Sequence, residues 1–201
     1  MNAAVPPPDQ LTGAQMRKVI GSRKAYIETE GRGEMTRWSI VVEEVGGTLW
    51  ACDNRNLLPA SWLARATVTG ETPGPGAWLL EAKATTLVDI DLPPIATLVR
   101  GITDSLPDIQ ELSPVRVGVS QALVRVGPVR GGGTALVVAF TRPDGEMVGI
   151  KDDYLQLHLG TSYLTDAVVA FDQVGGRMRP IVIRRGDTWS VLMPTSIPGR
   201  S

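Results

Sequence analysis

Glycine and proline interrupt this chain at short intervals and constrain its fold more than any other sequence feature. The 201 residues include 22 glycines and 15 prolines, most of them between short runs of valine, isoleucine, leucine and tryptophan. Such punctuation is typical of short strands joined by tight turns. Gly46-Gly47, Asp144-Gly145 and Gly186-Asp187 supply residues that take positive φ readily in hairpins. The sequence therefore predicts an α+β fold that is rich in antiparallel strands.

The expected strands are short apolar runs with alternating or continuous patterning. They cover Arg37 to Glu44, Thr48 to Ala51, Trp62 to Val68, Trp78 to Ala82, Val115 to Val126, Thr134 to Thr141, Leu155 to Leu159, Pro180 to Arg184 and Thr188 to Met193.

Helices are the minority, and the pattern predicts three of them. One runs from Leu11 to Glu28, one from Pro94 to Leu106, and one from Thr161 or Ser162 through Phe171 to its stop at Gly175-Gly176. The buried stripe of the first is expected to comprise Met16, Val19, Ile20, Tyr26 and Ile27, and that of the second Ile95, Leu98, Val99 and Ile102. Arg100 points away from the second stripe.

A helix followed by a small antiparallel meander recurs along the chain, with units that start near Leu11, Trp78 and Leu155. Residues 1–10 (MNAAVPPPDQ) are expected to form a flexible tail. A boundary between Pro73 and Pro94 divides the remainder into domains 11–87 and 88–201, and a boundary near Pro143 is the alternative.

Composition narrows the function classes. Lys+Arg 20 against Asp+Glu 21 gives a net charge of -1, so any contact with nucleic acid has to come from a local basic face. One cysteine and one histidine leave no internal disulfide and no zinc cluster. The N-terminus does not resemble a signal peptide, and no apolar window is long enough to cross a bilayer. We expect a cytoplasmic protein with no metal and no membrane contact.

Candidate catalytic groups are few. His158 and Cys52 are interpreted as structural, because each lies in an apolar strand pattern. The run from Gly131 to Gly133 lacks the Gly-Lys-Ser/Thr ending of a phosphate loop. Asp152 and Asp153 are adjacent on an expected strand and would point to opposite faces. The sequence therefore predicts no catalytic residues and no cofactor.

A basic face on the first expected helix is the one positive signal for nucleic acid. Arg17, Lys18 and Lys24 gather on the side opposite the apolar stripe. Such a stripe is either a solvated helix face or a surface that follows phosphates without reading sequence. With Arg100 these residues form the candidate DNA-facing set.

Several segments resemble bacterial β-type DNA polymerase sliding clamps. Trp189 to Ile197 (WSVLMPTSI) is similar to their C-terminal strand, with its aromatic residue, two aliphatics and Met-Pro. Gly160 to Val168 resembles the segment where a strand runs into a helix beginning Tyr-Leu-Leu-Asp, and Arg179 to Ile183 the penultimate strand. Thr48 to Leu57 (TLWACDNRNL) is similar to the strand that ends Ala-Thr-Asp-Gly-His-Arg-Leu.

The resemblance implies a non-enzymatic processivity factor with the DNA-clamp architecture, a β-rich outer layer and helices on the inner face. Such a ring, like the β subunit of DNA polymerase III, encircles duplex DNA without sequence specificity and tethers polymerase and other replication or repair proteins. A clamp loader is a further implied partner. A closed ring of six domains needs three copies of a two-domain chain, as in the clamps of some large bacteriophages.

The family binds partner peptides in an apolar pocket. Carried over by position, the pocket residues are Asp53, Asn54, Arg55 and Leu57 on one wall and Val191, Met193, Pro194 and Ile197 on the other. Asn54 stands where the family has Gly and Arg55 where it has His, while Thr195-Ser196 replaces Met-Arg. The alternative hypothesis is a β-rich structural or assembly protein of a phage, with no role in encircling DNA.

Overall fold

The computed structural model of the chain describes residues 11–29, 32–111, 115–116, 123–128, 134–141, 147–160, 167–171, 180–185 and 187–194. Within these ranges the fold mixes helices with antiparallel sheets, so the α+β class is confirmed. The chain divides into an N-terminal unit, Leu11–Asp104, and a C-terminal unit that begins at Ser105. The predicted tail, residues 1–10, lies outside the described residues. The sequence had suggested a boundary at residues 87–88.

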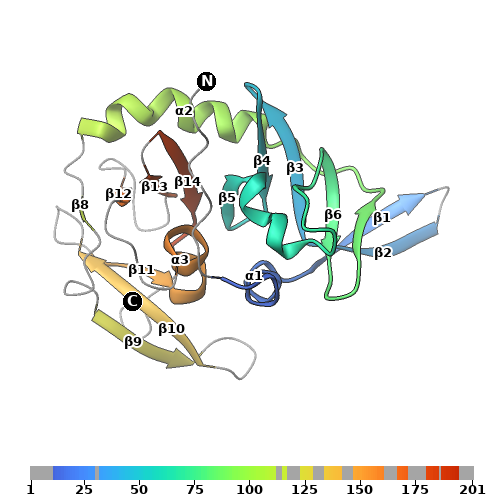
Figure 1. The fold of residues 1–201 in the computed structure, drawn as a ribbon, viewed down its shortest axis with the longest axis horizontal. Helices are drawn as coiled ribbons and strands as arrows, with labels where there is room; N and C mark the ends of the chain where they lie inside the picture. The colour runs from blue at the N-terminus through green and yellow to red at the C-terminus, as the bar shows by residue number, and fades with distance from the viewer. Residues whose placement is uncertain are drawn as a thin grey trace. The chain divides into compact units, whose positions relative to one another are not determined.

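The N-terminal unit contains a sheet with the strand order β7-β6-β3-β4-β5 and a separate β1-β2 hairpin, all antiparallel. Figure 1 shows this hairpin extending away from the sheet. The elements are α1 (Gly13–Ile20), β1 (Arg23–Thr29), β2 (Arg32–Trp38), β3 (Ile40–Val45), β4 (Thr48–Cys52), β5 (Asn56–Pro59), η1 (Ala60–Ala66), β6 (Gly76–Leu80) and β7 (Thr85–Val88).

Helix α1 is much shorter than predicted. The Thr12 and Gln15 side chains form a capping box at its start, and Gly21, at φ 66°, ends it. Glycine takes this conformation at little steric cost, which makes it a natural helix terminator. The prediction of a helix to Glu28 is therefore wrong beyond Ile20, and Tyr26 belongs to a strand.

The strand predicted from Trp62 to Val68 is also wrong, because residues 60–66 form the 3-10 helix η1. Trp62 and Leu63 on η1 and Met16 on α1 are all nearly inaccessible to solvent. The Arg17 guanidinium donates a hydrogen bond to the carbonyl of Ala66 at 3.0 Å. Apolar packing and this bond together hold α1 against η1.

Helix α2 (Ala96–Glu111) confirms the second predicted helix, with both ends shifted toward the C-terminus. One carboxylate oxygen of Glu43, on β3, accepts hydrogen bonds from the backbone N–H groups of Ile95 at 2.7 Å and Ala96 at 3.2 Å. A carboxylate here satisfies otherwise unpaired N–H groups and complements the helix dipole. Ile95 and Val99 are buried as predicted, whereas Leu98 is exposed. This docking keeps the start of α2 in the N-terminal unit.

The C-terminal unit contains two antiparallel sheets, with strand orders β11-β10-β9 and β14-β13-β12-β8. Its elements are β8 (Val115–Arg116), β9 (Leu123–Pro128), β10 (Thr134–Thr141), β11 (Met147–Lys151), α3 (Asp152–Leu159), β12 (Ala167–Phe171), β13 (Ile181–Arg185) and β14 (Thr188–Leu192). The predicted strands at Thr134 to Thr141, Pro180 to Arg184 and Thr188 to Met193 are confirmed to within a residue at each end.

Two assignments in this unit are reversed. Leu155 to Leu159, predicted as a strand, lies in α3, because Leu155 and Leu159, four residues apart, share a helix face in the core. The helix predicted from Thr161 or Ser162 to Gly175-Gly176 is wrong over Ala167–Phe171, where β12 pairs with both β13 and β8. Pairing on both sides favours the β-branched Val168 and Val169 in a strand.

Each α-helix precedes antiparallel strands in the chain order, which agrees in outline with the predicted helix-plus-meander units. The starts near Leu11 and Leu155 fall close to α1 and α3. Trp78, the third predicted start, lies within β6, and the next helix begins only at Ala96.

A pair of glycines tests the packing of α1. A β-carbon at Gly13 would overlap the carbonyl oxygen of Arg65, whereas one at Gly101 in α2 would meet nothing within 4 Å. We expect Gly13→Ala to lower the free energy of unfolding by about 1–3 kcal/mol through overpacking. Gly101→Ala should raise it by about 0.5–1 kcal/mol, since alanine is the better helix former. Urea unfolding of both variants measures the difference, and equal stabilisation would contradict the close approach.

Candidate functional site

The segment from Asp53 to Leu57, called the Asp53 turn below, comprises the connection after β4 and the first two residues of β5. The Asp53 carboxylate accepts hydrogen bonds from the backbone N–H of Arg55 at 2.9 Å and of Asn56 at 2.7 Å. The Asn56 side-chain amide reaches both carboxylate oxygens, at 3.1 and 3.0 Å. Asn54 has a φ of 70°, in the left-handed region that asparagine tolerates better than most residues. The turn is thus built around one carboxylate and one positive φ.

Arg23, on β1, connects the Asp53 turn to the base of the hairpin. Its guanidinium lies 3.6 Å from an Asp53 carboxylate oxygen, donates to the Ser39 carbonyl at 3.2 Å, and stacks 5.4 Å from the Trp38 ring centroid. The Asp53 side chain is almost fully buried. A buried carboxylate is tolerated where hydrogen bonds and an opposite charge compensate for lost hydration, and both are present here.

The predicted partner-pocket residues of the Asp53 turn differ in accessibility. Asp53 and Leu57 are each 2% exposed, so they shape the turn from inside. Asn54 and Arg55 are exposed and form its outer surface. In the N-terminal unit, the surface that a partner can touch at this turn is therefore polar and cationic.

The residues of the other predicted wall belong to the C-terminal unit. Val191 and Pro194 are buried and Met193 is half-buried, while Ile197 lies outside the described residues. Val191 pairs with Val182 of β13 in the antiparallel ladder. β13 and β14 are antiparallel neighbours over this region.

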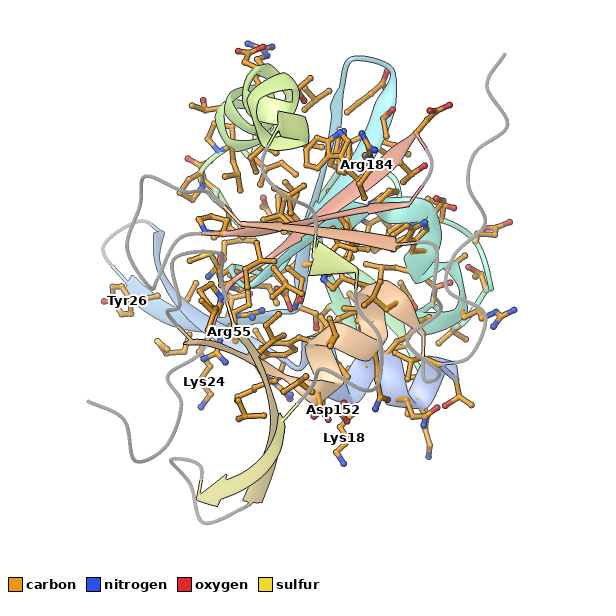
Figure 2. All side chains as sticks on the ribbon, turned by 90° about the vertical axis from the view of Figure 1, so that its left-hand side faces the viewer. Lys18, Lys24, Tyr26, Arg55, Asp152 and Arg184 are labelled. Atoms are coloured by element: carbon orange, nitrogen blue, oxygen red, sulfur yellow. The ribbon has the colours of Figure 1, made fainter. Side chains whose placement is uncertain are left out.

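The predicted basic stripe is not continuous, because the first helix ends before Lys24. Lys18 is exposed on α1 and Arg100 is exposed on α2. Arg17 is half-buried and bonded to η1, so its guanidinium serves packing. Lys24 is an exposed residue of β1 (Figure 2). Of the four candidate cations, two remain exposed on helices and one is exposed on the hairpin.

His158 and Ser190 form a buried pair between α3 and β14. Their Nδ1 and Oγ atoms are 2.7 Å apart, and both residues are 0% exposed. Burial lowers the pKa of His158 to about 3, so the imidazole is neutral at neutral pH. A substrate has no access to the pair in this conformation, and its position favours a role in packing.

Three further sequence features were candidates for chemistry: the Asp152–Asp153 pair, Cys52 and the glycine run 131–133. Asp152 and Asp153 are the first residues of α3, not of a strand; Asp152 is buried and Asp153 exposed. Burial, then the nearby Asp153 charge, raises the pKa of Asp152, and its hydrogen bond from the Gln156 amide opposes this. Burial raises the pKa of the Cys52 thiol. The glycine run 131–133 lies outside the described residues.

Two further kinds of site are absent from the part of the chain that the structure describes. Among the described residues, no three His, Cys, Asp or Glu side chains are grouped closely enough to hold a metal ion. None of the helices in the described ranges has the length and apolar character needed to span a membrane.

Comparison of the chain with protein-family models, with curated proteins and with solved structures found no match.

Sequence reasoning missed Arg23 and Asn56, which complete the Asp53 turn, and the surface position of Tyr26. The available signal was Gly21 directly after Ile20, where a helix stops, followed by an alternating segment that begins at Arg23. No local pattern links Arg23 to Asp53, because thirty residues separate them in the chain.

The positive φ at Asn54 gives a direct test of the Asp53 turn. We expect Asn54→Gly to leave the free energy of unfolding within about 0.5 kcal/mol of the parent chain, since glycine adopts this φ freely. Asn54→Val should lower it by about 1–2 kcal/mol, because a β-branched residue is strained there. Thermal or urea unfolding measures both, and equal effects would show that the left-handed conformation does not constrain this position.

The buried His158 predicts a pH dependence of stability. Its pKa in the folded chain is about 3, below the usual 6.5. The unfolded chain therefore binds a proton that the folded chain excludes as pH falls below about 6.5. As the pH is lowered below about 6.5, the titration of His158 should reduce the free energy of unfolding by up to about 1.4 kcal/mol per pH unit. Above about pH 6.5 this group should cause no loss of stability.

The non-titrating variant His158→Asn is the control. It should be less stable than the parent near neutral pH and should show a shallower loss between about pH 6.5 and pH 5. Identical slopes in urea unfolding would mean that His158 is not buried in its neutral form. His158 is the single histidine of the chain, so its imidazole NMR signals report the titration without overlap.

Proposed function

We propose that this chain is a sliding clamp: a non-enzymatic ring, formed by three copies, that encircles duplex DNA in the cytoplasm and tethers a DNA polymerase. The observation that carries the proposal is the positive φ of Asn54 in the Asp53 turn. The clamp family resembled by this segment has glycine at that position, and glycine is the residue that takes this conformation most readily. Asn54 of this chain thus adopts a conformation that the family's glycine would also adopt readily.

The chain order of the elements supports the same proposal. A clamp is built from helices that precede antiparallel strands, and α1 and α3 are each followed by such strands. The ends of two resembling segments also fit, since β4 stops at Cys52, just before the Asp53 turn, and β14 stops at Leu192, just before Met193-Pro194. The segment from Gly160 to Val168 does not fit, because helix α3 precedes it and strand β12 begins at Ala167. The proposed surfaces for partner proteins are the exposed part of that turn and the end of β14.

The proposed contact with DNA is sparse and electrostatic. Lys18 and Arg100 are the exposed cations of the candidate set that lie on helices, whereas α3 begins with two aspartates. A few phosphate contacts with no base contacts give weak, salt-sensitive and sequence-independent binding, which suits a protein that slides. Retention on DNA then depends on ring closure.

The decisive experiment measures mass by light scattering and retention on nicked circular DNA. We expect a discrete assembly of three 21.5 kDa chains that stays on the circle and is lost after the DNA is linearised. The double variant Lys18→Gln/Arg100→Gln should bind more weakly and reduce the slope of log affinity against log salt by about 0.9 per lost phosphate contact. The exposed Lys83, changed to Gln, is the matched control.

A monomer, or an open polymer that is indifferent to DNA ends, would overturn the clamp proposal. It would favour the alternative of a β-rich structural or assembly protein of a phage. A closed ring whose salt slope is unchanged in the double variant would leave the ring in place and exclude Lys18 and Arg100 from the DNA contact.

A further inference from the structure

The β1-β2 hairpin carries an exposed apolar pair on one face. Tyr26 is 66% exposed and Met35 is 53% exposed. The two residues are directly opposite each other in the antiparallel register, so their side chains share a face. Single exposed apolar residues are common on soluble proteins. A cross-strand pair that includes an aromatic ring is a larger patch and suggests a contact surface.

Two cations lie beside this pair on the same face. Lys24 and Arg37 are opposite each other in the register, and both are exposed. Each lies two residues along its strand from Tyr26 or Met35, so all four side chains share a face. Like charges placed directly opposite destabilise a hairpin. Arg37 is partly compensated by Glu81 at 3.5 Å and donates to the Ser22 hydroxyl at 2.7 Å. No acidic side chain among the described residues pairs with Lys24, so an external anion would relieve the repulsion.

The Tyr26 ring is positioned by its own hairpin. A β-carbon at Gly33 would overlap the ring atoms and the hydroxyl of Tyr26, so the ring extends over the glycine. Figure 2 shows the Tyr26 and Lys24 side chains directed away from the ribbon. An aromatic ring held in place by a cross-strand glycine loses little further conformational freedom when a ligand stacks on it.

The hairpin is also anchored on its other face. Trp38 is buried at its base and holds Arg23 by a cation–π contact. The next residue, Ser39, donates its backbone N–H to the Trp78 carbonyl at 2.7 Å and ties the end of the hairpin to β6. On the opposite face Lys24, Tyr26 and Met35 are exposed, so a ligand can contact them without disturbing the sheet. The outer face, defined by Lys24, Tyr26, Met35 and Arg37, is the proposed site.

We propose that this outer face binds single-stranded nucleic acid, with phosphates at Lys24 and Arg37 and an unpaired base stacked on Tyr26. Cations interleaved with an exposed aromatic ring are the usual elements of such a site. In a duplex the base faces are already stacked on one another, so a single strand is the form that can use the ring.

This inference goes beyond the proposed clamp, since it requires no ring and concerns a single strand and not an encircled duplex. The test is fluorescence anisotropy of a labelled thymidine oligonucleotide titrated with the full-length chain. We expect Tyr26→Leu, which keeps apolar cover over Gly33, to weaken binding about tenfold, as the loss of one stacked base implies. Tyr26→Phe should bind like the parent. Val68→Ala, at an apolar residue that is 53% exposed outside the hairpin, is the matched control.

The salt dependence of binding tests the proposed phosphate contact of Lys24 separately. Lys24→Gln should reduce the slope of log affinity against log salt by about 0.7, the value for one phosphate on a single strand. Lys83→Gln, at another exposed lysine, should leave the slope unchanged. Unfolding midpoints equal to the parent's for Tyr26→Leu and Lys24→Gln would show that the hairpin remains folded.

The outcomes separate this site from the clamp proposal. Binding of the single strand that depends on Tyr26 and Lys24, without retention on circular DNA, would support the hairpin site and overturn the clamp. Retention on circles with no single-strand binding would overturn the hairpin site alone. Equal binding by Tyr26→Leu and Tyr26→Phe, or self-association abolished by Tyr26→Leu in the absence of nucleic-acid binding, would assign the face to another contact and refute the inference.

Discussion

The contacts of the N-terminal unit depend most on the buried carboxylate of Asp53, which links the turn after β4 to the β1-β2 hairpin. It receives hydrogen bonds from two backbone N–H groups and from the amide of Asn56, and it faces the guanidinium of Arg23. Without such partners a buried carboxylate would cost several kcal/mol, so these contacts are coupled requirements. Since Arg23 also stacks on Trp38, one charge centre links the Asp53 turn to the hairpin.

The first turns of α1 and α2 also depend on side chains that pair with their backbone N–H groups. Glu43 on β3 caps α2 from the sheet, and Thr12 with Gln15 caps α1 locally. Helices in proteins gain most of their stability from tertiary contacts, so these links to η1 and to the sheet determine where α1 and the start of α2 lie within the N-terminal unit. Each of these helices then presents one exposed cation, Lys18 or Arg100. The proposed DNA contact thus depends on contacts made by residues that do not touch DNA.

Local patterns predicted the strands well wherever alternation and a turn signal coincide. Thr48–Cys52, Thr134–Thr141 and Thr188–Leu192 are confirmed nearly to the residue. Two strand predictions are wrong, at Trp62 to Val68 and at Leu155 to Leu159. The apolar residues of each segment are compatible with the periodicity of a helix as well as with that of a strand. Because the first helix was extended past Gly21, Tyr26 was assigned to its core stripe and the exposed hairpin was missed.

The sequence by itself determined the α+β class and the turns at glycine-rich dipeptides such as Gly46-Gly47, because these depend on neighbouring residues and on backbone preference. Tertiary structure decided which cations are free and which serve packing. Arg17 and Arg23 are occupied by partners on η1 and in the Asp53 turn, whereas Lys18 and Lys24 are exposed. Burial and pairing join residues that are far apart in the chain, so no local pattern contains them.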